Sequence, residues 1–303
     1  MSVVATPYIE PAERTDGALV QARTPSQLAW RRFRQSRLAL LGLVILTVLV
    51  ALAVLAPWIA PHGQNEIDLF SIKAPPSREH LLGTDALGRD VLSRMLYGGR
   101  MSLAIGVAAA VICSAVGILF GTIAGYYGGW VDGTIMRFVD LMLAFPSIFL
   151  LLIIAAMFEG ISVWGVIFFL GLFSWMWLTR IIRAEFLSLK RREFVEAARS
   201  IGVSDRQIIT RHLLPNVIGA IVVSFTLDVA LFMLAEAGLS FLGFGVPPGI
   251  PTWGNMLSES RTDYLTDPLL AILPGLALTI AVLAFNFVGD GLRDAFDPKG
   301  SRG

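Results

Sequence analysis

The sequence is poor in charged residues, which excludes most soluble classes of protein. Charged side chains make up 16% of the 303 residues, where soluble domains carry about 25%. The net charge of +1 gives no reason to expect nucleic acid as a partner. With 55% hydrophobic residues and a mean hydropathy of +0.70, the composition is typical of a protein that crosses a membrane several times.

Cysteine and histidine are scarce as well. Cys113 is the one cysteine, so it cannot form an intrachain disulfide, and we expect a small packed side chain there. The three histidines, His62, His80 and His212, lie far apart and show no metal-ligand spacing. The sequence therefore predicts no metal site.

Motifs that would mark an enzyme are missing. There is no G-x-x-x-x-G-K-[ST] phosphate loop and no Gly-Lys pair, so ATP must be bound by another chain if it is used at all. There is also no G-x-S-x-G and no H-E-x-x-H motif. We expect a non-catalytic chain without a cofactor of its own.

Six apolar segments are long enough to cross a membrane as helices. They are residues 38–59, 101–127, 135–158, 161–178, 217–245 and 269–288. Only Glu159 and Gly160 separate the third span from the fourth, which predicts a tight helical hairpin. The sequence thus predicts an all-α membrane protein.

Glycines and prolines within the spans carry packing information. Gly117, Gly121 and Gly125 recur every four residues in the second span, which predicts close approach of a neighbouring helix. Pro146 in the third span and Pro274 in the sixth each predict a kink.

Basic residues predict the orientation. Four arginines precede the first span, which places the N-terminus in the cytoplasm, and six crossings return the C-terminus there. Residues 180–211 hold eight basic residues against four acidic ones, whereas 61–98 holds four against five. We therefore expect a flexible cytoplasmic tail at 1–30 rather than a cleavable signal sequence, a first transmembrane helix at 31–60, an extracytoplasmic segment at 61–98 and a cytoplasmic tail at 296–303.

A few acidic residues fall inside the spans, where charge is costly and often functional. Asp228 and Glu236 lie in the fifth span and are candidates to face a transport pathway. The alternative for each is a hydrogen bond between helices or a pair with arginine. Asp140 is expected to pair with Arg137, nearly one turn away.

The loop at 180–215 is long and reads as helices. Residues 193–202 predict a short helix with acids in its first turn and Gly202 at its end. Ser204 to Gln207 fits a capping box that starts a further helix through Leu214, before Pro215. The short helix is either a mechanical element, in which Ala197 and Ala198 allow it to sit deep in a partner's groove, or an ordinary interfacial helix.

This loop resembles the EAA loop of ABC importer permeases. The residues that match are Glu196, Ala197, Ala198, Gly202, Leu214 and Pro215, at the spacing of that motif. His212 stands where the general pattern has Ile, and the run R-H-L-L-P-N is similar to the variant of the peptide-importing branch.

Further motifs extend the resemblance from about His80 to Pro298. Four segments are similar to motifs of the dipeptide/oligopeptide permease family, whose importers also include nickel and glutathione systems. They are H-L-L-G-T-D-A-L-G-R-D-V-L-S-R at 80–94, L-A-F-P at 143–146, L-S-F-L-G-F-G at 239–245 and the segment from A-F-N at 284–286 to D-P at 297–298. The pattern is nearest to the second, C-type subunit. In the family Glu often precedes the tryptophan at position 253, and Thr252 departs from this.

The resemblance implies a type I ABC importer permease fold, with a core at 99–295 whose coupling helix contacts a cytosolic ATPase. The partners that it implies are a homologous second permease, two ATPase subunits that bind ATP and Mg²⁺, an extracytoplasmic solute-binding protein and membrane lipid. It implies import of dipeptides or oligopeptides, with glutathione or nickel as alternatives, and a self-sufficient secondary transporter as a rival without ATPases. Asp85, Arg89 and Asp90 are candidates for an outer gate or a contact with the binding protein, although turn formation by Thr84, Asp85 and Gly88 explains that motif as well.

Overall fold

The computed structural model describes residues 25–157, 161–263 and 265–296, and within them it contains helices and no strand. The helices are α1 (Pro25–Phe33), α2 (Arg37–Ile59), α3 (Val91–Tyr127), α4 (Gly129–Leu143), α5 (Ser147–Met157), α6 (Val163–Leu172), α7 (Met176–Leu189), α8 (Glu193–Ser200), α9 (Asp205–Gln207), the π-helix η1 (Ile208–Leu213), α10 (Leu214–Phe241), α11 (Trp253–Glu259), the 3-10 helix η2 (Ser260–Thr262) and α12 (Leu269–Phe296). Most of the predicted tails lie outside the described residues.

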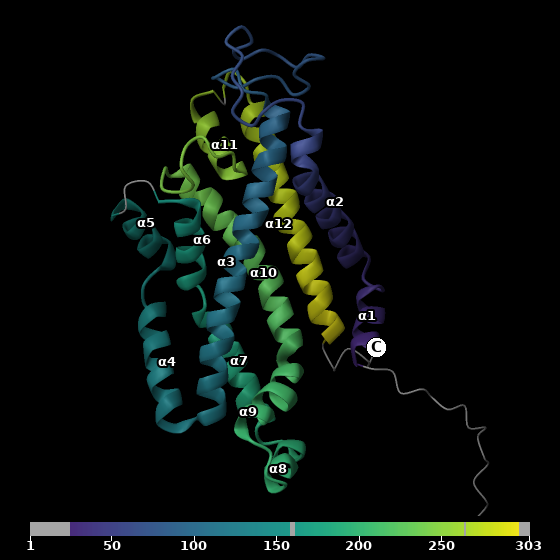
Figure 1. The fold of residues 1–303 in the computed structure, drawn as a ribbon, viewed down its shortest axis with the longest axis vertical. Helices are drawn as coiled ribbons and strands as arrows, with labels where there is room; N and C mark the ends of the chain where they lie inside the picture. Colours follow the sequence, from purple (N-terminus) through teal and green to yellow (C-terminus); the bar gives the residue numbers. More distant parts are fainter. Residues whose placement is uncertain (1–24, 158–160, 264, 297–303) are drawn as a thin grey trace, which may run out of the picture.

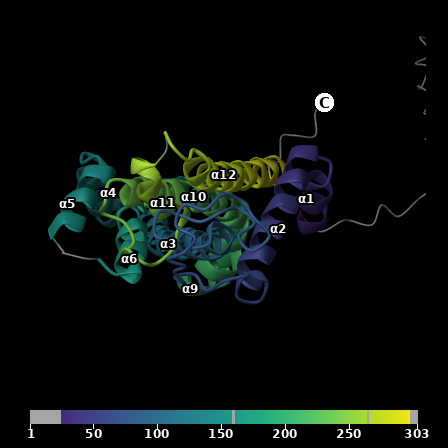
Figure 2. The same ribbon diagram turned by 90° about the horizontal axis from the view of Figure 1, so that it is seen from above.

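The bundle has two distinct ends. Figure 1 shows α8 at one end, and α11 with the 61–90 segment at the other. We call these the α8 end and the α11 end. Seen from above in Figure 2, α1, α2 and α12 lie on one side, α4, α5 and α6 on the other, and α3 and α10 between them.

Helix α3 is the central element. It packs against α2, α6, α7 and α10, and its 37 residues span about 55 Å. It begins at Val91, ten residues before the predicted span, because the Asp90 side chain accepts a hydrogen bond from Ser93 N and caps it. It ends at Tyr127, and the next residue, Gly128, has a φ of 69°, which favours glycine.

The predicted glycine face of α3 is confirmed. Gly117, Gly121 and Gly125 contact α7 through Leu178, Ile182 and Phe186, respectively. A Cβ built on Gly121 would lie 2.7 Å from the Ile182 Cβ, which is closer than such atoms approach. The two helices can therefore pack at this distance only with glycine in α3.

Gly121→Val should therefore destabilise the protein by about 1–3 kcal/mol, because the added methyl groups overpack a filled contact. The thermal unfolding midpoint of the detergent-purified protein measures this. Gly133→Val in α4 is the matched control, since no atom lies within 4 Å of a Cβ there. Equal midpoints for the two variants would contradict the packing assigned to α3 and α7.

The predicted third and fourth spans are bent. Four helices are long and apolar enough to cross a membrane unbroken, and there are up to six spans if each bent pair counts as one. Helices α4 and α5 meet at 75° next to Pro146, which confirms that proline as a break. Helices α6 and α7 meet at 40°. The predicted hairpin at Glu159 and Gly160 lies outside the described residues.

The prediction of a separate helix that ends before Pro215 is wrong. The chain is helical without a break from Asp205 to Phe241. Pro215 therefore lies inside a continuous helix, directly after the wider turns of η1, and π-turns are one of the places where a helix is locally distorted. Ser204 stands at the N-cap as predicted, but its side chain makes no capping hydrogen bond.

Candidate functional site

Helix α8 ends as the sequence predicts. Gly202 has a φ of 80°, Gly202 N donates to Arg199 O over 2.9 Å, and Val203 N donates to Ala198 O over 3.0 Å. This pair of bonds is the Schellman arrangement, which requires a left-handed residue after the helix. No other atom lies within 4 Å of a Cβ at Gly202, so glycine is needed there for its conformation and not for space.

The two faces of α8 differ sharply. Val195 and Ala198 are buried in an apolar cluster with η1. Glu196 and Ala197 are exposed, and so are the large apolar side chains Phe194 (43%) and Ile201 (81%).

One of the predicted loop residues therefore needs a correction. Ala198 packs against its own chain, so its small size serves that contact and not a partner's groove. Leu214 is half-buried against the same cluster, while Pro215 is exposed. Sequence reasoning also missed Phe194 and Ile201, because large apolar residues on a short amphipathic helix are normally assigned to its inner face.

Tyr126 fastens the loop to the end of α3. Its hydroxyl donates to the Asp205 carboxylate, and its carbonyl oxygen accepts from Lys190 Nζ. The Arg199 guanidinium of α8 lies 5.6 Å from the centre of its ring, a cation–π distance. Polar contacts from three parts of the loop thus converge on one aromatic residue, which the sequence analysis did not single out.

Ion pairs connect α7 to α4. Arg183 binds both carboxylate oxygens of Asp132. Arg180 Nη2 lies 2.5 Å from Asp140 Oδ1, so the predicted pairing of Asp140 with Arg137 is wrong. Arg180 pairs with this carboxylate because α7 lies alongside α4. The Arg180 guanidinium lies 5.6 Å from the centre of the Trp177 ring.

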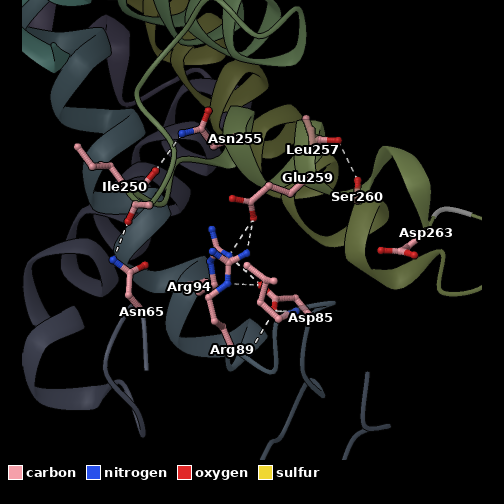
Figure 3. A network of polar contacts seen from close by, with 12 residues as sticks. Asn65, Asp85, Arg89, Arg94, Ile250, Asn255, Leu257, Glu259, Ser260 and Asp263 are labelled. Carbon is pink, nitrogen blue, oxygen red and sulfur yellow. Dashed lines mark hydrogen bonds and ion pairs between the residues drawn. The ribbon is translucent and has the colours of Figure 1, made fainter. Parts of the chain in front are cut away.

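A second polar network lies at the α11 end (Figure 3). Asp85 Oδ2 is 2.7 Å from both Arg89 Nε and Arg94 Nη1. Glu259 Oε2 of α11 accepts from Arg89 Nη2 over 2.8 Å and lies 2.9 Å from Arg94 Nη1. The network therefore joins the start of α3 to the end of α11, beside a cavity of about 40 Å³ that is large enough for a water molecule.

Asp85 also shapes the turn that holds this network. Its Oδ1 accepts from Leu87 N and Arg89 N at 2.9 and 3.0 Å, and Gly88 adopts a φ of 75°, so the predicted turn is confirmed. Burial by itself would raise the pKa of Asp85, but the Arg89 backbone N–H and the Arg89 and Arg94 guanidinium groups outweigh it and hold the pKa below its ordinary value. Arg89 and Asp90 are buried.

Glu236 is fully buried at the junction of α10 and α11. Its Oε1 accepts from Ser240 Oγ over 2.7 Å and from Thr252 Oγ1 over 2.9 Å, and Thr252 in turn caps α11 by accepting from Asn255 N. Glu236 thus matches the hydrogen-bonding alternative. Trp253, the next residue of α11, reaches α3 by donating from Nε1 to Met95 O.

Asp228 occupies a different setting, so the structure does not bring the two acids of α10 together. It is half-buried, and its Oδ2 lies 3.7 Å from Cys113 Sγ of α3. Cys113 is buried as predicted, and it also supplies a weak hydrogen-bond donor to the carboxylate.

Comparison with known proteins identifies two matching family profiles. Residues 117–302 match the binding-protein-dependent transport system inner membrane component, and residues 24–76 match the N-terminal TM domain of oligopeptide transport permease C. A glutathione transport system permease protein, GsiD, of Escherichia coli O6:K15:H31 is 45% identical over 280 residues, 92% of each chain. A chain of Brucella suis biovar 1, named as a candidate peptide permease protein, is 44% identical over 289 residues, 94% of this chain and 95% of that one.

The fold is shared with a solved structure. It is an inward-facing MetNI methionine ABC transporter, whose matching chain superposes with a TM-score of 0.54 at 18% identity. The match covers 67% of this chain and 96% of that one. Together with the helical content and the four to six candidate spans, it confirms the predicted fold class.

Proposed function

Because the chain belongs to the family of inner membrane components of binding-protein-dependent transport systems, we propose that it forms half of the translocation pathway of an ATP-driven importer of short peptides, glutathione included. It is a multi-pass membrane protein and an ABC importer permease. The single observation that carries the substrate class is the 44–45% identity, over almost the whole chain, to permeases named for glutathione and for peptides.

The proposed partners follow from the same family. A homologous permease completes the pathway, two cytosolic ATPases bind ATP and Mg²⁺, and an extracytoplasmic binding protein delivers the peptide. The excess of basic residues at 180–211 supports a cytoplasmic position for the α8 end and for both termini.

We assign α8 and the turn at Gly202 to the contact with an ATPase. Glu196, Ala197, Phe194 and Ile201 form an exposed surface of mixed apolar and acidic character, which fits a protein groove. Val195 and Ala198 fix the opposite face to the chain itself, and Leu214 and Pro215 support the base of the loop.

Movement of α8 is transmitted through Tyr126. Its bonds to Asp205 and Lys190 link the loop to α3, and the glycine contacts link α3 to α7. When two ATPases close on ATP, this rigid connection moves the spans that line the pathway. The chain itself needs no catalytic residue for this step.

The polar residues at the membrane and at the α11 end take separate roles in this proposal. Asp228, which is half-buried, faces the pathway, whereas Glu236 positions α11. Asp85 and Arg89 hold α11 on α3 as part of the outer gate, and Asp90 supports them by capping α3.

Reconstitution tests the proposal. This chain, its partner permease and the ATPases are reconstituted in liposomes. We expect uptake of a radiolabelled dipeptide or of glutathione only when ATP is on the side of the membrane that carries the ATPases and the binding protein is on the opposite side. Uptake by this chain alone would contradict the proposal and support a secondary transporter. Uptake of Ni²⁺ but of no peptide would contradict the substrate class.

A further inference from the structure

The structure brings together three residues that the sequence keeps apart. His62 lies just after α2, His80 lies in the 61–90 segment, and Asp90 is the N-cap of α3. One potential ligand atom from each lies within 4.8 Å of the other two. Two of the three histidines, far apart in the sequence, therefore lie close together, while the expectation of no metal site stays a prediction.

Hydrogen bonding within this group leaves ring nitrogens unused. His80 Nδ1 lies 3.0 Å from Asp90 Oδ1, and His62 Nδ1 lies 3.8 Å from the same oxygen, beyond hydrogen-bond distance. His62 Nδ1 and His80 Nε2 are both buried without a hydrogen bond among the residues that the structure describes. The His80 side chain is only 6% exposed. Buried polar atoms normally have a partner, so the unpaired His62 Nδ1, which lies 3.8 Å from the Asp90 carboxylate, indicates that a ligand belongs between them.

The three side chains are held in place by the backbone around them. Asp90 Oδ2 accepts from Ser93 N over 2.7 Å, which leaves Oδ1 pointing toward the histidines. His62 N donates to Ser93 Oγ over 3.0 Å, so the same first turn of α3 positions two of the three residues. The imidazole rings lie 4.7 Å apart and 30° from parallel.

The surroundings favour a cation. Among the described residues, a cavity of about 280 Å³ beside the two histidines is lined by four carboxylate side chains and by no lysine or arginine. They belong to Glu66, Asp68, Glu79 and Asp90. Asp68 Oδ2 lies 3.9 Å from His80 Nε2, beyond hydrogen-bond distance, and it adds a negative charge beside this ring.

We propose that His62, His80 and Asp90 bind one divalent transition-metal ion of the Zn²⁺ or Ni²⁺ class. Two imidazoles and one carboxylate suit these ions, whereas Mg²⁺ and Ca²⁺ prefer sites made of oxygen. In a tetrahedral site whose ligands lie about 2.1 Å from the ion, neighbouring ligand atoms are roughly 3.4 Å apart. The distances from Asp90 Oδ1 to His80 Nδ1, 3.0 Å, and to His62 Nδ1, 3.8 Å, lie on either side of this value. The bound ion fastens the end of α2 and the 61–90 segment to the start of α3.

Zinc titration of the full-length chain in lipid nanodiscs tests this site. After treatment with EDTA, the protein is titrated with Zn²⁺ against a fluorescent chelator, and bound metal is counted by mass spectrometry. We expect one Zn²⁺ per chain, a visible absorption band with Co²⁺, and a higher thermal unfolding midpoint with Zn²⁺ than without it.

Variants separate the site from unspecific binding. His62→Phe keeps a ring against His80 but removes both nitrogens, and it should weaken binding by about 100-fold or more. Asp68→Asn removes one negative charge beside His80 and should weaken it by up to about 10-fold, the scale of one charge acting through water. His212→Phe is the matched control, because His212 lies in η1 at the α8 end, and it should bind Zn²⁺ as the parent chain does.

Two results would overturn the proposal. One is the absence of stoichiometric Zn²⁺ binding by the parent chain. The other is equal affinity in His62→Phe, or in His62→Ala should the Phe variant not remain monodisperse. Neither depends on transport, so the metal site and the proposed import function stand or fall separately.

Discussion

Gly202→Asp is expected to abolish ATP-driven uptake while the protein still folds and inserts. A Cβ at position 202 meets no other atom within 4 Å, and Asp tolerates the left-handed backbone at a cost of about 1 kcal/mol. The new carboxylate lies at the C-terminus of α8, where the helix dipole disfavours it. An unpaired charge buried in the ATPase contact costs about 3–5 kcal/mol, which is roughly 100-fold or more in affinity.

Gly249→Asp is the matched control for this experiment. Gly249 also has a left-handed φ, 92°, and no atom within 4 Å of a Cβ, but it lies beside the 61–90 segment at the α11 end. Co-purification of the ATPases with an affinity-tagged permease should fail for Gly202→Asp and succeed for Gly249→Asp. Normal uptake and ATPase retention in Gly202→Asp would count against the role assigned to α8.

Arg94→Leu is expected to destabilise the protein by about 1.5–3 kcal/mol, the range for lost hydrogen bonds to charged groups. The Arg94 side chain is 2% exposed and lies between Asp85 and Glu259, and its removal costs each carboxylate one charged donor while Arg89 still binds both. Chemical denaturation of the detergent-purified protein measures the loss. Arg78→Leu, at an exposed arginine of the same segment, should change stability by less than about 0.5 kcal/mol.

The same network predicts a dependence on pH. The pKa of Asp85 is lowered in the folded protein, so the stability gained from its ionisation is complete above the ordinary pKa of about 3.9 and is lost as the pH falls through the lower native value. The stability difference between the parent chain and Asp85→Asn should therefore shrink only below about pH 4. A difference that disappears already near pH 6 would contradict the contacts assigned to Asp85.

Sequence alone was sufficient for features that depend on local chemistry. Gly202 ends α8 because a left-handed residue is needed there, and the four-residue spacing in α3 predicted the close approach of a neighbouring helix, which the structure identifies as α7. Pro146 marked a break because proline lacks the N–H that a helix needs. Each of these predictions uses residues within a few turns of one another.

Features that depend on how helices meet could not be predicted in this way. Arg180 replaces Arg137 as the partner of Asp140 because α7 lies against α4. Glu236 and Asp228 are both acidic residues within one apolar segment, so the sequence does not distinguish their roles. Glu236 is buried by α11, which comes from a later part of the chain. His62 and His80 are separated by 18 positions of loop and meet only because both lie beside the first turn of α3.

Photo-crosslinking from α8 tests the central claim most directly, namely that this helix binds an ATPase. A photo-reactive amino acid replaces the exposed Ala197 in one variant and Phe70, which is fully exposed in the 61–90 segment, in another. In the assembled transporter we expect position 197 to crosslink to the ATPase and position 70 not to do so. Crosslinking of the ATPase from position 70, or its absence from position 197, would contradict both the orientation and the coupling role of α8.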